Sequence, residues 1–136
     1  MTGKMTPKPT RRELEIMSVL WKRGAGTVRE ILNELNEGRE EAFAYTTILR
    51  FLQIMHEKGL VERQEGGRTH VYRASAPEQD TKKELVKDLI DRAFGGSPRD
   101  LVLHLIGGEQ TSAAEVIEIQ EALQELESQE NQNPAL

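Results

Sequence analysis

The sequence predicts a mostly α-helical fold with a small β-hairpin, divided into an N-terminal domain of three helices plus the hairpin and a C-terminal domain of three helices. Apolar residues recur at helical spacing in six segments, whereas the stretch after Gly59 alternates like paired strands. Four capping-box motifs of the form Ser/Thr-x-x-Glu indicate helix starts at Thr10, Thr27, Thr81 and Ser112. The Ala-Ser-Ala-Pro stretch at residues 74–77 indicates a linker between the two domains.

The first three helices are predicted over Arg11–Lys22, from Thr27 to the polar run that begins at Asn36, and over Tyr45–Lys58. Their apolar residues at helical spacing are Leu14, Met17, Leu20 and Trp21 in the first, Val28, Ile31, Leu32 and Leu35 in the second, and Ile48, Leu52 and Met55 in the third. Because no short helix buries such a stripe alone, we expect the three to share one core.

The predicted hairpin joins a strand at Leu60–Arg63 to a strand at Thr69–Arg73. If Gly66 and Gly67 are the two central turn residues, Val61 pairs with Tyr72, and Arg63 with His70. Three helices followed by a glycine-tipped hairpin are typical of a winged helix-turn-helix domain. In that arrangement the third helix enters the major groove of DNA and the hairpin lies along the phosphates.

This geometry assigns a role to each polar residue that faces away from the expected core. The candidates for reading bases are Thr46, Thr47 and Arg50, since Arg50 can donate two parallel bonds to guanine. The candidates for phosphate contacts are Thr27, Arg29, Tyr45, Gln53, Arg68 and His70. The alternative is that Thr46 only caps its helix, that Arg50 is a solvated charge, and that ordinary turns explain the other polar residues.

The C-terminal helices are predicted at about Thr81–Phe94, Pro98–Ile106 and Ser112–Glu127. The last has a narrow apolar seam, and the middle one is apolar nearly all round, so a second copy of the chain is the expected cover. The expected dimerisation residues are Leu89, Leu101, Leu105, Val116, Ile119, Leu123 and Leu126. The predicted domains are a disordered N-terminus at 1–9, a winged-helix DNA-binding domain at 10–75, a linker at 76–80, a helical dimerisation domain at 81–128 and a disordered tail at 129–136.

The charge distribution and the missing residue types narrow the function further. The net charge is −5, but residues 1–75 carry a balance of +3 and residues 76–136 a balance of −8. Such a split fits a protein that presents only its N-terminal half to phosphates, although charge halves also differ by chance. The absence of cysteine excludes thiol catalysis, disulfides and thiolate metal sites. No apolar run predicts a membrane span or signal peptide, so we expect a cytoplasmic protein.

No catalytic motif or metal site is indicated. The chain has neither a phosphate-binding loop nor a Gly-x-Ser-x-Gly motif. Its three histidines, His56, His70 and His104, fall on three different predicted elements, and none has a second ligand at i+3 or i+4. We therefore expect no enzyme, no cofactor and no metal.

Several short stretches resemble the penicillinase and methicillin-resistance repressors, a family that also contains copper-responsive repressors. The resemblance covers about residues 10–128. The matching stretches are Glu13–Met17, Val19–Trp21, Thr27–Glu30, Ala44–Ile48, Glu57–Val61 and, in the hairpin, Gly67-Arg68 through Tyr72. It implies a homodimeric repressor that binds a dyad-symmetric double-stranded DNA operator until a signal removes it.

The resemblance also implies how such a repressor is released. In β-lactam-responsive members a membrane-bound sensor metalloprotease prompts cleavage after a Leu-Val-Leu segment, which here precedes the His104–Leu105 bond. The chain departs from the family at this bond, where the best-known members have Asn-Phe, and at Ile54, where a basic residue is common. It also lacks the cysteine motif of the copper-responsive members. A winged-helix protein-interaction module without DNA binding is the alternative function.

Overall fold

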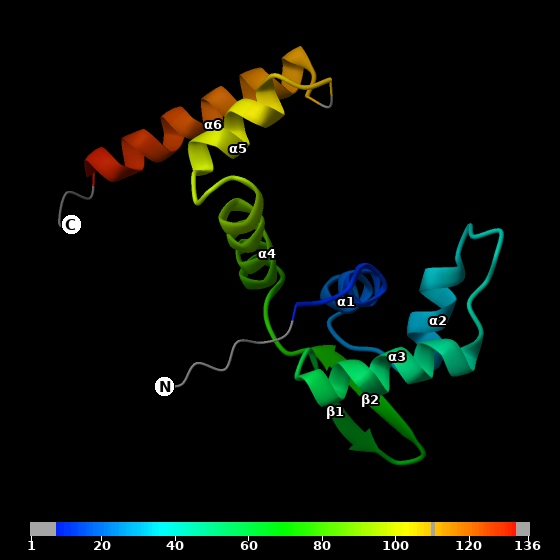
Figure 1. Cartoon of the computed structure of the whole chain (residues 1–136). Coiled ribbons are helices and arrows are strands. Elements are labelled where there is room, and N and C mark those ends of the chain that lie inside the picture. The colour runs from blue at the N-terminus through cyan, green and yellow to red at the C-terminus, as the bar shows by residue number, and fades with distance from the viewer. Residues whose placement is uncertain (1–7, 110, 133–136) are drawn as a thin grey trace. The chain divides into compact units, whose positions relative to one another are not determined.

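A computed structural model describes residues 8–109 and 111–132 (Figure 1). The described residues form six helices and one antiparallel pair of strands, which confirms the predicted fold class. The elements are α1 (Arg11–Arg23), α2 (Val28–Asn36), α3 (Tyr45–Lys58), β1 (Val61–Gly66), β2 (Thr69–Ala74), α4 (Glu78–Ala93), α5 (Pro98–Ile106) and α6 (Ala113–Gln132). The chain divides into two compact units, residues 1–85 and 86–136, and the boundary falls inside α4.

The N-terminal unit has one core, shared by its first three helices and the base of the hairpin. The helices contribute Ile16, Met17, Leu20, Val28, Ile31, Leu32, Ile48, Leu52 and Met55, and the hairpin region adds Leu60, Val61 and Tyr72. The buried stripe of α1 differs from the predicted one, because Leu14 and Trp21 are only half-buried while Ile16 and Glu13 are buried. Trp21 instead lies at the edge, where its indole N–H donates to the Ala76 carbonyl (2.9 Å).

Local sequence explains where most of these helices begin and end. Thr10 and Thr27 form reciprocal capping boxes with Glu13 and Glu30, as predicted. Gly24 and Gly59, with φ of 90° and 84°, end α1 and α3 in a backbone region that favours glycine. The start of α3 is different, because its N-cap residue is Ala44, which has no side-chain acceptor.

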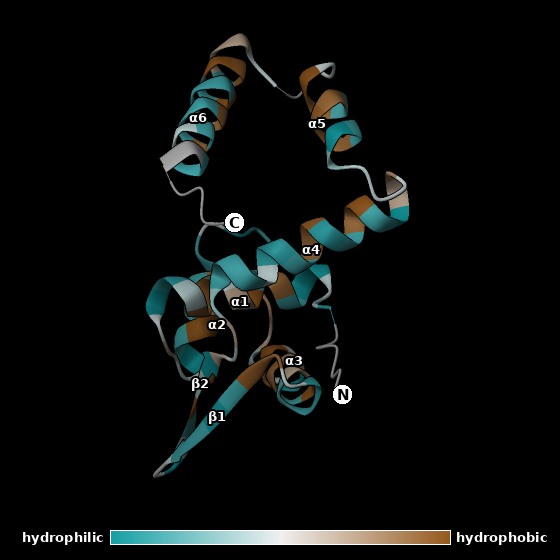
Figure 2. Ribbon diagram, turned by 90° about the vertical axis from the view of Figure 1, so that its left-hand side faces the viewer, coloured by the Kyte–Doolittle hydropathy of each residue, from teal (hydrophilic) through white to brown (hydrophobic). Residues whose placement is uncertain are grey.

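The hairpin forms where it was predicted, but its register is different. Val61 pairs with Ala74, and Arg63 with Tyr72, so the expected pairing of Val61 with Tyr72 is wrong by two residues. The two central turn residues are Gly67 and Arg68 rather than Gly66 and Gly67. Gly67 has a φ of 71°, which suits the first central position of a type II′ turn. The hairpin projects from the three helices, and most of β1 is hydrophilic (Figure 2).

The helix α4 begins at Glu78, inside the predicted linker at 76–80, so the proposed cap at Thr81 is wrong. The Pro77 carbonyl accepts from the N–H groups of Asp80 and Thr81, which places Thr81 within the first turn. Its side chain is buried and lines a small crevice with Met17 and Leu60 of the core. Tertiary packing therefore overrides the capping motif at this position.

The C-terminal unit exposes most of its apolar side chains. No side chain of α5 is buried, and none of the described side chains of α6 is buried. Hydrophobic residues cover much of α5 (Figure 2). The helix α6 runs to Gln132, four residues into the predicted disordered tail at 129–136, and the rest of that tail and residues 1–7 lie outside the described residues. Among the residues described, no helix combines the length and apolar content needed to cross a membrane.

Candidate nucleic-acid interface

The third helix separates its side chains into a core face and an exposed face. The core face consists of Ile48, Leu52 and Met55, as predicted. The exposed residues include the three proposed base-reading residues and one proposed phosphate ligand, namely Thr46, Thr47, Arg50 and Gln53. Ile54 is half-buried. A regular helix thus holds the polar residues that the sequence analysis placed on one surface.

The polar residues at the start of α3 have no structural task that occupies their side chains. Ala44 is the N-cap, so the alternative in which Thr46 caps the helix is wrong. Within the described residues, no hydrogen bond or ion pair engages the side chains of Thr46, Thr47 or Arg50. Their donors and acceptors are therefore available to a ligand.

Two of the proposed phosphate ligands meet where α2 and α3 begin. The Arg29 guanidinium lies over the ring of Tyr45, 4.8 Å from its centroid. Arg29 belongs to the first turn of α2 and Tyr45 is the first residue of α3. A cation over an aromatic face is attracted by the ring quadrupole. The two helix N-termini are thereby linked by a charged side chain that stays exposed.

Thr27, also proposed for phosphate contact, performs the structural task of a cap. Its hydroxyl accepts from the Glu30 N–H (3.2 Å), and its own N–H donates to the Glu30 carboxylate (2.9 Å). That second bond, together with the nearby Arg23 guanidinium, holds the pKa of Glu30 below its ordinary value. Arg23 also pairs with Glu34 (3.1 Å), so one arginine balances two carboxylates beside the start of α2.

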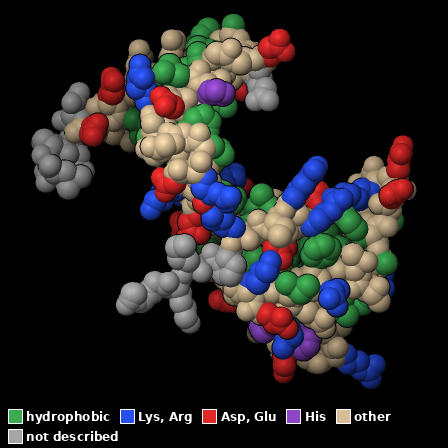
Figure 3. All heavy atoms as spheres, in the orientation of Figure 1, with side chains coloured by type: hydrophobic (Ala, Val, Ile, Leu, Met, Phe, Trp, Pro, Cys, Tyr) green, Lys and Arg blue, Asp and Glu red, His purple; other side chains and the backbone are tan. Residues whose placement is uncertain are grey.

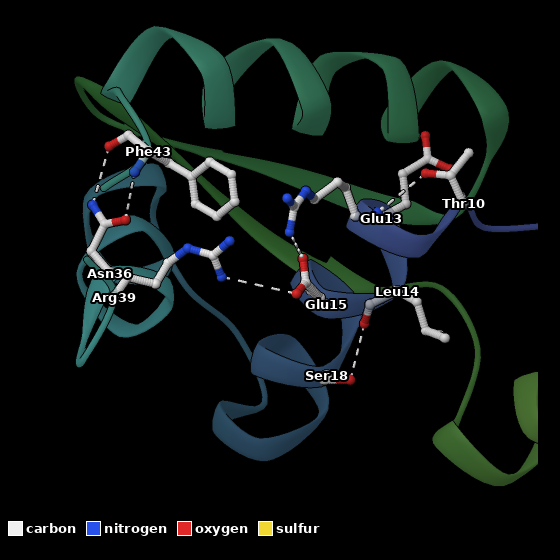
Figure 4. Close-up of polar contacts among 9 residues, drawn as sticks. Thr10, Glu13, Leu14, Glu15, Ser18, Asn36, Arg39 and Phe43 are labelled. Carbon is white, nitrogen blue, oxygen red and sulfur yellow. Dashed lines mark hydrogen bonds and ion pairs between the residues drawn. The ribbon is translucent and has the colours of Figure 1, made fainter. Parts of the chain in front are cut away.

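Between α2 and α3, the side chain of Asn36 holds the backbone of Phe43 (Figure 4). The Asn36 amide donates to the Phe43 carbonyl (3.1 Å) and accepts from the Phe43 N–H (2.8 Å). The Phe43 ring lies under the guanidinium groups of Arg39 (4.3 Å) and Arg12 (5.1 Å). Both arginines pair with Glu15 of α1, at 2.9 Å for Arg12 and 4.0 Å for Arg39.

The other end of α3 is attached to α1 by an ion pair. Lys58 donates to both carboxylate oxygens of Glu13 (2.9 and 3.1 Å), and Glu13 is only 2% exposed. Burial alone raises the pKa of Glu13, but the Thr10 N–H and the Lys58 ammonium outweigh it and hold the pKa below 4.5. Glu13 therefore stays charged and anchors the C-terminal end of α3.

The hairpin presents its two proposed phosphate ligands differently. Arg68 is exposed at the second central position of the turn. His70 is half-buried on the same side of β2 as the buried Tyr72, with its ring edge-on to the Tyr72 ring at 6.5 Å. Its Nδ1 is buried and has no partner among the described residues. The exposure of Arg68 suits a phosphate contact better than the position of His70.

Two residues that hold the ends of α3 in place, Asn36 and Glu13, could not be identified from the sequence. In the sequence, Asn36 belongs to a polar run that is predicted to end a helix, and Glu13 is one half of a predicted capping box. The position of Glu13 is on the apolar side of α1, four residues before Met17, but a carboxylate adds nothing to an apolar pattern, so its burial gives no signal in the sequence. Among the described residues, no cluster of three or more His, Asp or Glu side chains has metal-binding geometry.

The exposed face of α3, the linked starts of α2 and α3 and the hairpin tip all carry exposed hydroxyl or guanidinium groups. Lys and Arg side chains stand out from the face of the N-terminal unit shown in Figure 3. In Figure 1 the hairpin lies beside α3, and the two elements are in contact. Such groups can donate to base edges and to phosphate oxygens.

Comparison with known proteins places the chain in a family. The family model described as penicillinase repressor matches residues 9–125. The penicillinase repressor of Bacillus licheniformis is 27% identical over 90% of this chain and 94% of its own length. The methicillin resistance regulatory protein MecI of Mammaliicoccus sciuri is 24% identical over 82% and 89%. RosR of H. salinarum, a solved structure that is 21% identical, shares the fold with a TM-score of 0.50 over 91% of this chain and 98% of that one. The chain belongs to the penicillinase repressor family.

Proposed function

We propose that this protein is a sequence-specific DNA-binding repressor that acts as a homodimer on a dyad-symmetric operator in the cytoplasm. One observation carries the proposal: a regular helix presents Thr46, Thr47 and Arg50 together, exposed and unoccupied by other side chains. Family membership supports it, since relatives along most of the chain are named penicillinase repressors. The protein performs no catalysis in this role and needs no cofactor.

In the proposed complex, α3 lies in the major groove with its N-terminal turn deepest. Arg50 donates to guanine, and Thr46 and Thr47 contact base edges or thymine methyl groups. The proposed phosphate contacts come from both sides of this helix, namely Thr27, Arg29, Tyr45 and Gln53 with Arg68 and His70 of the hairpin. Phosphate contacts set the register of the protein on the duplex, and base contacts read its sequence.

The homodimer is proposed because the C-terminal unit exposes too much apolar surface for a single copy. Leu123 and Leu126 on α6 are 50% and 60% exposed, and Leu89 and Leu105 are 46% and 43% exposed. The remaining proposed contact residues, Leu101, Val116 and Ile119, are half-buried. Large exposed apolar patches on soluble proteins mark interaction sites, and the heptad spacing on α6 favours pairing with an equivalent helix.

Release of the repressor is proposed to occur by cleavage of the His104–Leu105 bond, prompted by a membrane-bound sensor metalloprotease. This bond lies in the last turn of α5, with both side chains exposed. The Leu105 carbonyl accepts from the Thr111 hydroxyl (2.7 Å), and His104 lies edge-on to Phe94 (5.5 Å between centroids). Since proteases act most readily on exposed, locally unfolded segments, cleavage requires that turn to unwind.

A salt titration of DNA binding tests the central proposal. The wild-type chain is first used to select duplexes from a pool of random sequences, and its affinity for the selected duplex is then measured at rising salt. If about 6–10 phosphates are neutralised, affinity falls by about 10³–10⁵ between 50 and 200 mM salt. A protein-interaction module selects no duplex and has no such affinity to lose, which would refute the proposal.

A further inference from the structure

The start of α3 has no side-chain cap, unlike the starts of α1 and α2. Alanine at an N-cap leaves the first N–H groups of a helix without a side-chain acceptor and is among the poorest caps. The backbone carbonyl of Ala44 accepts the first bonds, from the N–H groups of Thr47 (3.1 Å) and Ile48 (3.3 Å). The constraint on where this helix begins must therefore come from contacts other than an N-cap side chain.

Asn36 supplies that constraint. It is the last residue of α2, and its half-buried side chain binds both backbone groups of Phe43, the residue just before the N-cap. A side-chain amide offers a donor and an acceptor in one plane, so two bonds fix the orientation as well as the distance of the bound peptide. Ala retains neither group, and Asp retains only the acceptor.

The Phe43 side chain is held as firmly as its backbone. It packs against the core and lines a narrow crevice with Ile48, Leu35 and Phe51. Phe43 precedes the N-cap and Ile48 is the fourth helical residue, which is the spacing of a hydrophobic staple. The guanidinium groups of Arg12 and Arg39 lie over its ring, and both pair with Glu15 of α1. Phe43 is thus fixed relative to both α1 and α2.

We propose that Asn36 is a positioning residue for DNA recognition, which acts through Phe43 to set where Thr46 and Thr47 lie in the groove. Only Ala44 separates Phe43 from Tyr45, so few rotatable backbone bonds lie between Phe43 and the first helical residues, and a shift of Phe43 reaches them. Arg68 belongs to the hairpin, outside the segment from Phe43 to Tyr45 through which such a shift would act. This inference rests on the proposed function.

The test compares Asn36→Ala with the control Asn33→Ala, an exposed asparagine of the same helix. Both folded variants are titrated with the duplex that the wild type selects and with random-sequence duplex. Loss of one or more well-placed base contacts predicts that Asn36→Ala binds the selected duplex at least about tenfold more weakly. Its affinity for random duplex, which depends on phosphates, changes much less, and Asn33→Ala matches the wild type in both titrations. If Asn36 were important only for stability, Asn36→Ala would lower the urea midpoint of unfolding. The difference between its affinities for the selected and the random duplex would stay as in the wild type.

A double-mutant cycle tests the path through α3. Combining Asn36→Ala with Thr46→Ala should cost less than the sum of the single losses, because Thr46 is already misplaced, whereas the combination with Arg68→Ala should be additive. Additivity with Thr46, or full affinity of folded Asn36→Ala, overturns the inference while the proposed function stands. If Asn36→Ala does not fold, Asn36→Asp, which retains one of the two bonds, is measured by the same criteria. A wild-type chain that selects no duplex removes the proposed function, and the inference with it.

Discussion

The guanidinium of Arg29 lies over the ring of Tyr45 and joins the first turn of α2 to the first turn of α3, 4.8 Å from cation to ring centroid. From the sequence, each of the two residues is separately a candidate phosphate ligand. The structure brings them together, so that the ring restricts the conformations of a long, exposed side chain. A charge ordered in advance loses less conformational entropy when it binds a phosphate.

Removing the ring should therefore weaken DNA binding through Arg29. We expect Tyr45→Ala to lower affinity for all duplexes alike, and Tyr45→Phe, which retains the ring under the cation, to lower it less. In a double-mutant cycle with Arg29→Ala, the coupling should be about 0.5–1 kcal/mol. Affinities measured by fluorescence anisotropy for the four proteins provide the cycle. Strict additivity would show that the two residues act independently.

Arg50 should affect sequence preference rather than general affinity. We expect Arg50→Ala to cost about 1–3 kcal/mol on the selected duplex and to relax discrimination at one base pair per half-site, because a bidentate contact to guanine is lost. Competition with singly substituted duplexes measures this. Arg68→Ala is the control, since loss of a phosphate contact should weaken all sequences about equally and reduce the salt slope by about 1. An equal loss on all duplexes for Arg50→Ala would contradict base readout.

The exposed leucines of α6 should determine the oligomeric state. We expect the double change Leu123→Asp with Leu126→Asp to give monomers, because it places two charges on the proposed apolar seam. Sedimentation velocity measures the mass. The matched control, Gln124→Asp with Ser128→Asp, adds the same charge at exposed positions beside the seam and should leave a dimer. A dimer of unchanged stability in the leucine variant would place the interface elsewhere.

The ion pair between Glu13 and Lys58 should make the N-terminal unit sensitive to acid. The pKa of Glu13 is lower in the folded chain than its ordinary value of 4.5, so its stabilising contribution is complete above about that pH and is lost as the pH falls through the folded-state pKa. We expect Glu13→Gln to lower the free energy of unfolding at pH 7 by about 2 kcal/mol, since a buried charge-assisted hydrogen bond is lost.

Urea denaturation at pH 7 and at a pH below the folded-state pKa of Glu13 checks this expectation. The difference between wild type and Glu13→Gln should shrink at the lower pH, where the wild-type carboxyl is protonated and has lost its charge. Glu15→Gln is the control: its pairs with Arg12 and Arg39 involve partly exposed side chains and should contribute about 0–1 kcal/mol. Equal losses at both pH values would mean that Glu13 contributes by packing alone.

Elements whose signals are local could be predicted from the sequence. The capping boxes at Thr10 and Thr27 form as expected, because each needs only atoms within four residues. The same motif failed at Thr81, where packing against Met17 and Leu60 placed the threonine inside the helix. The hairpin register failed because two adjacent glycines allow two turn positions, and the sequence does not distinguish them; the structure places the turn at Gly67 and Arg68.

The amino-acid sequence by itself determined the element types and the exposed face of α3, because helical periodicity separates Thr46 and Arg50 from Ile48 and Leu52. Only the tertiary structure decided which groups hold that helix in place. The contacts of Asn36 with Phe43 and of Glu13 with Lys58 join residues 7 and 45 positions apart. Polar contacts over such separations leave no periodic pattern in the chain, since they depend on where the packed core brings its elements together.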